Sequence, residues 1–190
     1  MDSINKSLEN WLNDLNNFSF KSFEQLPDLE LYMDQVVTFL EKQLYIFQNS
    51  TLDKQITPSM INNYVKGEVL PAPVSKKYAK EHLALIEEIC TLKQVLSIAE
   101  VKQIIDKSYS GEDKALAFNK FNQLNSEKTS SVVTEAFKQL NDIALEFAIT
   151  ANSYINIAKK ILYLSRAYER LEEQQEKHKK HEENTKEESN

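Results

Sequence analysis

The chain has 190 residues, of which 41% are hydrophobic and 27% charged, as in one ordinary globular domain or two small ones. Its two glycines and four prolines indicate a helical protein with few loops, and its single cysteine, Cys90, excludes an internal disulfide and indicates a reducing compartment. The formal net charge is −6, and no apolar stretch approaches the roughly 18 residues of a membrane-spanning helix. We therefore expect a mainly α, cytoplasmic protein.

The first 28 residues are predicted to form an amphipathic helix and an aromatic connector that ends near Pro27. Their apolar residues are Ile4, Leu8, Trp11, Leu12 and Leu15 in the helix and Phe18, Phe20 and Phe23 in the connector. A second helical pattern covers residues 29–46, and the polar segment 48–55 follows as a turn. We interpret 29–46 as the first helix of a helix-turn-helix domain that spans residues 29–110.

Most of the helix-breaking residues lie between positions 57 and 80. Thr57 and Pro58 predict an N-cap and a first helical turn, and Gly67 predicts the end of that helix. This spacing predicts a short helix over residues 58–66. The turn sequence VLPAP and the lysine-rich sequence SKKYAK follow, which is the order that a winged helix-turn-helix requires.

The strongly basic part of the chain coincides with this helix and loop. Residues 54–80 carry five Lys against one Glu, whereas residues 1–50 carry three Lys against eight Asp or Glu. An acidic remainder weakens non-specific attraction to phosphates but leaves a local basic patch able to dock. Double-stranded DNA is therefore the first partner to consider, and an ordinary solvated face is the alternative.

Three further helices are predicted before the C-terminal part. The first has one apolar stripe that includes Cys90, which we interpret as a small buried hydrophobe. The second begins at Ser97, because Glu100 three residues later completes a capping box. Gly111 ends that segment, and a shorter amphipathic helix is expected over residues 112–128.

A heptad pattern runs through residues 133–168. Its residues alternate spacings of four and three and include Phe137, Leu140, Phe147, Ala151, Tyr154, Ala158 and Ile161. This face is too wide and too long for one helix to leave in water, so it must cover the chain's own helices or a second subunit. Periodicity leaves an intramolecular bundle and a homodimer open for this region, residues 111–172.

Residues 173–190 are almost wholly polar, and we expect a charged, disordered tail. His178 and His181 lie there without a Cys or a fixed carboxylate geometry, so we interpret them as tail residues and expect no metal site. The sequence also lacks a Gly-rich phosphate loop, an HExxH motif and a G-x-S-x-G motif. We therefore expect neither an enzyme nor a cofactor.

The sequence INNYVKGEVLP resembles the recognition helix and turn of MerR-like winged helix-turn-helix regulators, which read L-R-Y-Y-E followed by G-L-L-P. Tyr64 and Pro71 keep the spacing of that family, and Lys76 and Lys77 resemble the basic residues of its wing. Residues 30–107 more closely resemble the bacterial family called domain of unknown function 1836, itself regarded as MerR-like. The resemblance implies a winged helix-turn-helix domain followed by a helical C-terminal region.

This resemblance also implies that residues 58–66 enter the major groove of DNA. Asn62 and Asn63 replace the Arg and the first aromatic residue of the MerR pattern, and an Asn amide can make a bidentate contact to adenine. The long helix would pair two subunits, and the sequence does not identify a small-molecule effector. The expected DNA-binding residues are Ser59, Asn62, Asn63, Lys66, Lys76, Lys77 and Lys80, while Ile61 and Tyr64 face the core.

The alternative is a protein-interaction module that keeps the helix-turn-helix shape without binding DNA. The acidic first fifty residues and the missing recognition arginine favour this alternative. The lysine cluster favours DNA, because it lies where a wing requires it.

Overall fold

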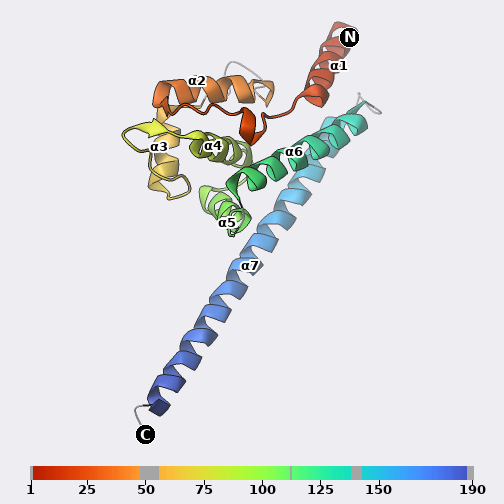
Figure 1. The fold of residues 1–190 in the computed structure, drawn as a ribbon. Helices are drawn as coiled ribbons and strands as arrows, with labels where there is room; N and C mark the ends of the chain where they lie inside the picture. The colour runs from red at the N-terminus through yellow and green to blue at the C-terminus, as the bar shows by residue number, and fades with distance from the viewer. Residues whose placement is uncertain (1, 48–55, 112, 138–142, 188–190) are drawn as a thin grey trace. The chain divides into compact units, whose positions relative to one another are not determined.

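The computed structural model describes residues 2–47, 56–111, 113–137 and 143–187 (Figure 1). These residues are mainly α-helical, as predicted, with a small antiparallel sheet. Two compact units make up the chain, Met1–Phe147 and Ala148–Asn190. The described elements are α1 (Asp2–Asn17), a 3-10 turn (Phe23–Gln25), β1 (Leu31–Tyr32), α2 (Met33–Leu44), a 3-10 turn (Tyr45–Phe47), α3 (Pro58–Lys66), β2 (Lys77–Tyr78), α4 (Lys80–Leu92), α5 (Ile98–Ser108), α6 (Lys114–Ala136) and α7 (Ile143–Glu187).

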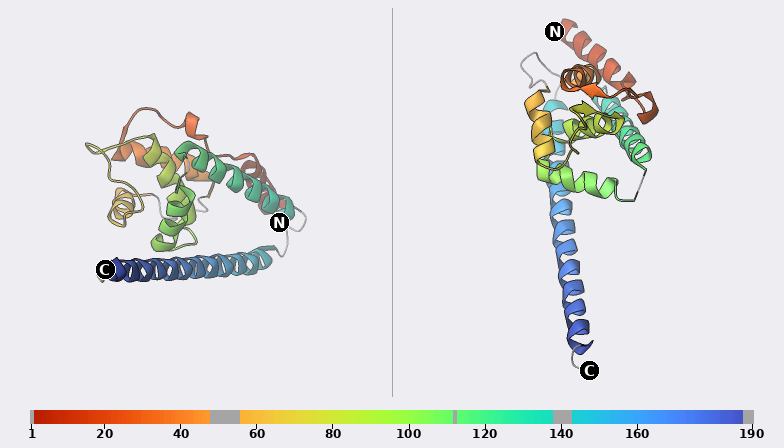
Figure 2. Two further views of the ribbon diagram at one scale, coloured as in Figure 1. Left: turned by 60° about the horizontal axis from the view of Figure 1, so that its bottom comes forward. Right: turned by 60° about the vertical axis from the view of Figure 1, so that its left-hand side comes forward.

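The core of the first unit is built around α4. Figures 1 and 2 show α2, α3, α5 and α6 arranged about this helix. Its buried residues are Leu83, Ala84, Ile86, Glu87, Glu88, Ile89 and Cys90. Cys90 is buried, as predicted, and burial raises the pKa of its thiol to about 12. Each fully buried Ile or Leu side chain contributes about 1.5–3 kcal/mol.

Side-chain caps set the starts of several helices. The Thr57 hydroxyl accepts a hydrogen bond from the backbone N–H of Met60 at 3.3 Å, as predicted for the start of α3. Ser97 and Glu100 form the predicted capping box at the start of α5. Asp113, which was not predicted as a cap, accepts two backbone hydrogen bonds at the start of α6. Caps of this kind contribute about 1 kcal/mol each.

A two-stranded antiparallel sheet, formed by β1 and β2, was not predicted. Leu31 pairs with Tyr78 and Tyr32 pairs with Lys77, so β1 lies against the strand that leads into α4. The expected helix over residues 29–46 is correspondingly shorter, because its first residues are extended. A strand of two residues has no measurable period, which is why hydrophobic spacing could not show it.

The predicted heptad helix is divided between two helices. α6 extends to Ala136, well past the expected end at residue 128, and α7 begins at Ile143. Leu140, one of the predicted pairing residues, lies outside the described residues. The heptad spacing continues across this boundary, so periodicity alone could not reveal it.

α1 packs on the C-terminal half of α6 within the first unit. The cluster they form joins residues far apart in sequence, namely Leu12, Val133 and Ala136, with Leu8, Leu15 and Phe147 beside them. Phe147 therefore contacts the chain's own helices, in agreement with the intramolecular alternative at that position.

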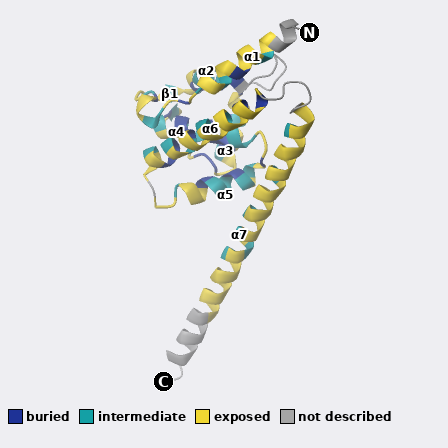
Figure 3. Cartoon of the chain, turned by 90° about the vertical axis from the view of Figure 1, so that its right-hand side faces the viewer, coloured by how far each residue is buried: buried dark blue, intermediate teal, exposed yellow. Residues whose placement is uncertain are grey.

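The second unit is the remainder of α7, and most of its described side chains are exposed (Figure 3). The helix continues to Glu187, whereas a disordered tail was expected from residue 173. Glu, Gln and Lys have good helix propensity, and oppositely charged residues four apart, such as Glu173 and Lys177, support a helix without a core. No described helix is both long and apolar enough to cross a membrane.

Two carboxyl groups of α4 are buried in the core. Glu87 is 0% exposed, and neither of its carboxyl oxygens has a hydrogen-bond partner among the described residues. The pKa of Glu87 is raised to about 8, mainly by burial and in part by the neighbouring Glu88, while Lys21 opposes the shift. Burial likewise raises the pKa of Glu88 to about 7, although Glu88 accepts a hydrogen bond from Tyr109 at 3.0 Å.

Replacing Glu87 by Gln is expected to reduce the pH dependence of folding stability. The pKa of Glu87 is about 8 in the folded state and 4.5 in the unfolded state. The stability that its protonated form contributes is therefore fully present below about pH 4.5, decreases as the pH rises above that value, and is lost by about pH 8. The free energy of unfolding of the wild type should fall by about 3 kcal/mol more than that of Glu87→Gln between about pH 5 and 8. Urea unfolding at both pH values measures this.

The exposed Glu9→Gln substitution is the matched control and should behave as the wild type does. If Glu87→Gln loses as much stability as the wild type over this range, Glu87 is not the group that titrates.

Candidate nucleic-acid interface

α3 has a buried apolar face and an exposed polar face. Ile61 is 0% exposed and Tyr64 is 5% exposed, so both face the core as predicted. Burial raises the pKa of the Tyr64 hydroxyl well above its usual range. The exposed face carries four of the predicted DNA-binding residues, which are Ser59, Asn62, Asn63 and Lys66.

The chain leaves α3 through a turn that is held by backbone and side-chain hydrogen bonds. The Tyr64 carbonyl accepts from the N–H groups of Val69 and Leu70 at 3.1 and 3.2 Å. Glu68 adopts a φ of 54°, and its carbonyl accepts from the Nζ of Lys102 on α5 at 2.7 Å. These bonds set the direction in which the chain runs from α3 toward β2.

A tight turn over residues 74–77, here called the wing turn, precedes β2. The N–H of Lys77 donates to the carbonyl of Val74 at 2.9 Å, and the two also form a β-bridge. Ser75 and Lys76 have φ values of 51° and 64°, as the central residues of a type I′ turn do. A positive φ costs a residue other than Gly about 1–2 kcal/mol. Ser75 and Lys76 are therefore not residues from which a type I′ turn would be predicted.

The lysines near the wing turn differ in their partners. Lys76 is exposed at the centre of the turn, and the Nζ of Lys77 lies 5.6 Å from the ring centroid of Tyr32 on β1. The Nζ of Lys80 lies 2.6 Å from an Asp28 carboxylate oxygen and donates to the Glu24 carbonyl at 3.3 Å. Lys80 is therefore paired within the chain, and its side chain is only 16% exposed.

Amide, hydroxyl and ammonium groups therefore gather on one side of the first unit. Figures 1 and 2 show α3 and the loop that contains the wing turn on the same side. Lys66 also lies in the last turn of α3, where a cation is favoured by the helix dipole. Such groups can donate hydrogen bonds to phosphate oxygens and to base edges. Within the described part of the chain, no His, Cys, Asp and Glu side chains gather in a group that could hold a metal ion.

The residues that hold this surface in place were not predicted. Asp28 and Tyr32 fix the lysines of β2 and α4, and Lys102 fixes the turn after α3. All three contact residues more than thirty positions away, and no local spacing signals a contact of that range.

Replacing Ser75 by Gly is expected to increase the free energy of unfolding by up to about 1 kcal/mol. Gly adopts a positive φ without steric cost, although the greater freedom of the unfolded chain offsets part of the gain. Ser131→Gly, at an exposed position inside α6, is the matched control and should lose about 1 kcal/mol. Chemical unfolding of the three proteins measures both effects, and an equal loss in both variants would contradict the type I′ turn.

One protein family was identified by comparison with family models. The model described as Domain of unknown function (DUF1836) matches residues 21–137, from the connector after α1 to the residue that follows α6. No curated protein and no solved structure matched the chain. The match includes α3, the wing turn and the residues that support them, and it leaves out α1 and α7. The chain therefore belongs to the DUF1836 family.

Proposed function

We propose that this protein is a DNA-binding transcriptional regulator of the MerR-like winged helix-turn-helix type. The observation that carries the proposal is the exposed polar face of a capped helix, α3, on the same side of the unit as a tight turn that displays lysines. A helix of this size fits the major groove, and a projecting turn fits the flanking backbone.

Each polar residue of this surface has a role that suits its chemistry. Asn62 and Asn63 present amides, which can pair with the N6 and N7 atoms of adenine, and Ser59 lies near the N-terminus of the helix. Lys66 and Lys76 carry exposed ammonium groups for phosphate oxygens. Asn62→Ala would relax base preference at one position, whereas loss of a lysine would weaken all sequences alike.

The supporting contacts argue for a surface that is formed before DNA arrives. The hydrogen bond from Lys102 to the Glu68 carbonyl holds the turn that follows α3. The ion pair between Lys80 and Asp28 holds the start of α4, just after the wing turn and β2. A surface that is already ordered loses less conformational entropy on binding. In this proposal Lys80 positions the start of α4 and does not touch phosphate.

The second unit supports pairing of two subunits along α7. Tyr154 is 69% exposed and Ile161 is 61% exposed, and Ala151 and Ala158 are exposed beside them. Large and small residues thus alternate at heptad spacing along one face of α7. Two copies joined there would present two α3 helices to two half-sites, as dimeric DNA-binding proteins do.

A protein-interaction module is the second candidate. Asn62 occupies the position of the MerR arginine, and the first fifty residues are acidic. Both features weaken DNA binding. Failure of the wild type to bind any duplex at low salt, together with recovery of one defined protein partner, would favour this candidate.

The double substitution Lys76→Ala with Lys77→Ala is expected to weaken duplex binding for every sequence. If both lysines contact phosphate, the slope of log affinity against log salt should become shallower by about 2. Fluorescence anisotropy with a labelled duplex, measured over a series of salt concentrations, gives this slope.

The control is Lys128→Ala with Lys177→Ala, which removes the same charge from α6 and α7. Its slope should equal that of the wild type. A slope that the wing-turn substitutions leave unchanged, or that the control lowers equally, would show that the wing turn does not contact the backbone.

Ile161→Glu is expected to convert a dimer of the full chain into a monomer, because it places a charge on the face that pairs. Phe147 is a poor probe of this, since it packs with α1 and α6 inside the chain. Asn156→Glu, an exposed position away from the heptad face, should leave the dimer intact. Sedimentation analysis measures the masses, and a monomeric wild type would contradict pairing along α7.

A further inference from the structure

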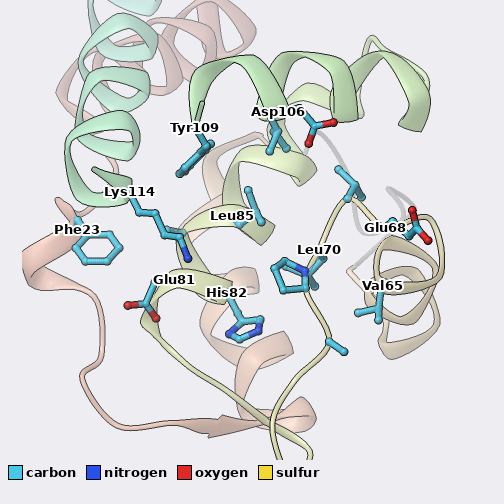
Figure 4. A pocket seen from close by; sticks show the side chains of 15 residues that line it. Phe23, Val65, Glu68, Leu70, Glu81, His82, Leu85, Asp106, Tyr109 and Lys114 are labelled. Atoms are coloured by element: carbon cyan, nitrogen blue, oxygen red, sulfur yellow. The ribbon is translucent and has the colours of Figure 1, made fainter. Parts of the chain in front are cut away.

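A cavity of about 580 Å³ lies between the end of α3, the segment that follows it, the start of α4, the end of α5 and the start of α6. Figure 4 shows its side chains around the cavity, with Phe23 and Lys114 on one side and Val65 and Leu70 on the other. Its volume falls in the range of pockets that hold drug-sized molecules, roughly 300–1,000 Å³. All of its lining residues belong to the first unit.

The cavity is bordered by the chain on both sides of the wing turn. Residues 68–72, which lead from α3 toward the wing turn, form one part of the lining. Glu81, Ala84 and Leu85, near the start of α4 just after β2, form another part. A molecule in the cavity therefore contacts the segment that enters the wing turn and the helix that follows it.

Most of the surface that lines the cavity is apolar. Its main apolar side chains are buried or partly buried and come from the connector, α3, the turn after α3, α4 and α5, namely Phe23, Val65, Leu70, Ala84, Leu85 and Ile105. Removal of such surface from water is the principal driving force available to a ligand here.

The polar groups of the lining are engaged within the chain or out of reach. The Tyr109 hydroxyl donates to a Glu88 carboxylate oxygen at 3.0 Å, and the Asp106 carboxylate lies 3.6 Å from the Nζ of Lys102. The Nε2 atom of His82 is buried and has almost no accessible surface. A ligand therefore gains little from carrying hydrogen-bonding groups into the cavity.

The remaining charged groups lie at the rim and do not select one sign of charge. Glu68, Glu81 and Lys114 are exposed, and solvent screens charges of that kind. A charged ligand would lose hydration in the apolar interior without gaining a buried partner of opposite charge. The lining therefore favours an uncharged molecule.

We propose that this cavity binds one uncharged, mainly apolar organic molecule of drug size. Its body lies against Leu70, Leu85 and Ile105, and its contacts with residues 68–72 and with α4 hold the turn after α3 in place. This inference goes beyond the proposed function and does not depend on it, because the ligand is bound by the protein alone.

Calorimetric titration of the full chain with three related probes tests the ligand class. Naphthylmethanol, naphthylmethylamine and naphthoate share an aromatic body but differ in charge at neutral pH. We expect one alcohol molecule to bind per chain, about tenfold more tightly than either charged probe. Absence of saturable binding of the alcohol, or a charged probe that binds as tightly, would overturn the proposal.

Two variants that fill the cavity test its position. Leu85→Trp adds bulk at the partly buried wall and Ala72→Trp adds it at the exposed edge, and each should weaken alcohol binding about tenfold. Leu116→Trp, at a position on α6 that is 61% exposed and outside the lining, is the matched control and should bind as the wild type does. Circular dichroism identifies the variants that fold. Folded cavity variants that bind the alcohol as tightly as the wild type would place the ligand elsewhere and overturn the proposal.

Hydrogen exchange tests the contact with the turn after α3. The backbone N–H groups of Val69 and Leu70 donate to the Tyr64 carbonyl, so their exchange reports opening of this turn. With the alcohol at about ten times its dissociation constant, exchange at both residues should slow about tenfold, while exchange in α1 should not change. Unchanged exchange at Val69 and Leu70 in the saturated protein would contradict binding in this cavity.

Discussion

The burial of α4 on every side is the constraint on which the first unit depends. Its residues from Ile86 to Cys90 are buried consecutively, so no single neighbour can cover them. α2 contributes Leu40, α3 contributes Tyr64 and β2 contributes Tyr78 to the same core. Because Tyr64 must face α4, the opposite side of α3 is left to solvent, and its polar residues form the candidate interface.

Local chemistry made part of this fold predictable. The bounds of α3 follow from Thr57, Pro58 and Gly67, and the start of α5 follows from its capping box, because caps and breakers act within one helical turn. The sheet, the type I′ turn and the division between α6 and α7 were missed. The sheet depends on pairing between distant residues, and the turn depends on a backbone geometry that Ser75 and Lys76 do not favour. The division between the two helices was missed because the heptad spacing continues across it.

The candidate interface was predictable to a similar degree. The MerR-like resemblance implied that Ser59, Asn62, Asn63 and Lys66 contact DNA, and all four are exposed on α3. Residue spacing could not show that Lys80 is paired with Asp28. It also could not show that Glu87 is buried beside Glu88, because a charged residue normally indicates exposure to solvent. The lysines that remain exposed on this surface are few, so the proposed DNA binding relies on geometry as much as on charge.

Recovery and sequencing of the DNA that is cross-linked to the tagged protein in its own cells tests the central claim most directly. The proposal predicts a limited set of enriched sites that share a short motif with two related halves. Enrichment no greater than that of an untagged control would contradict it and would favour a role in protein interaction.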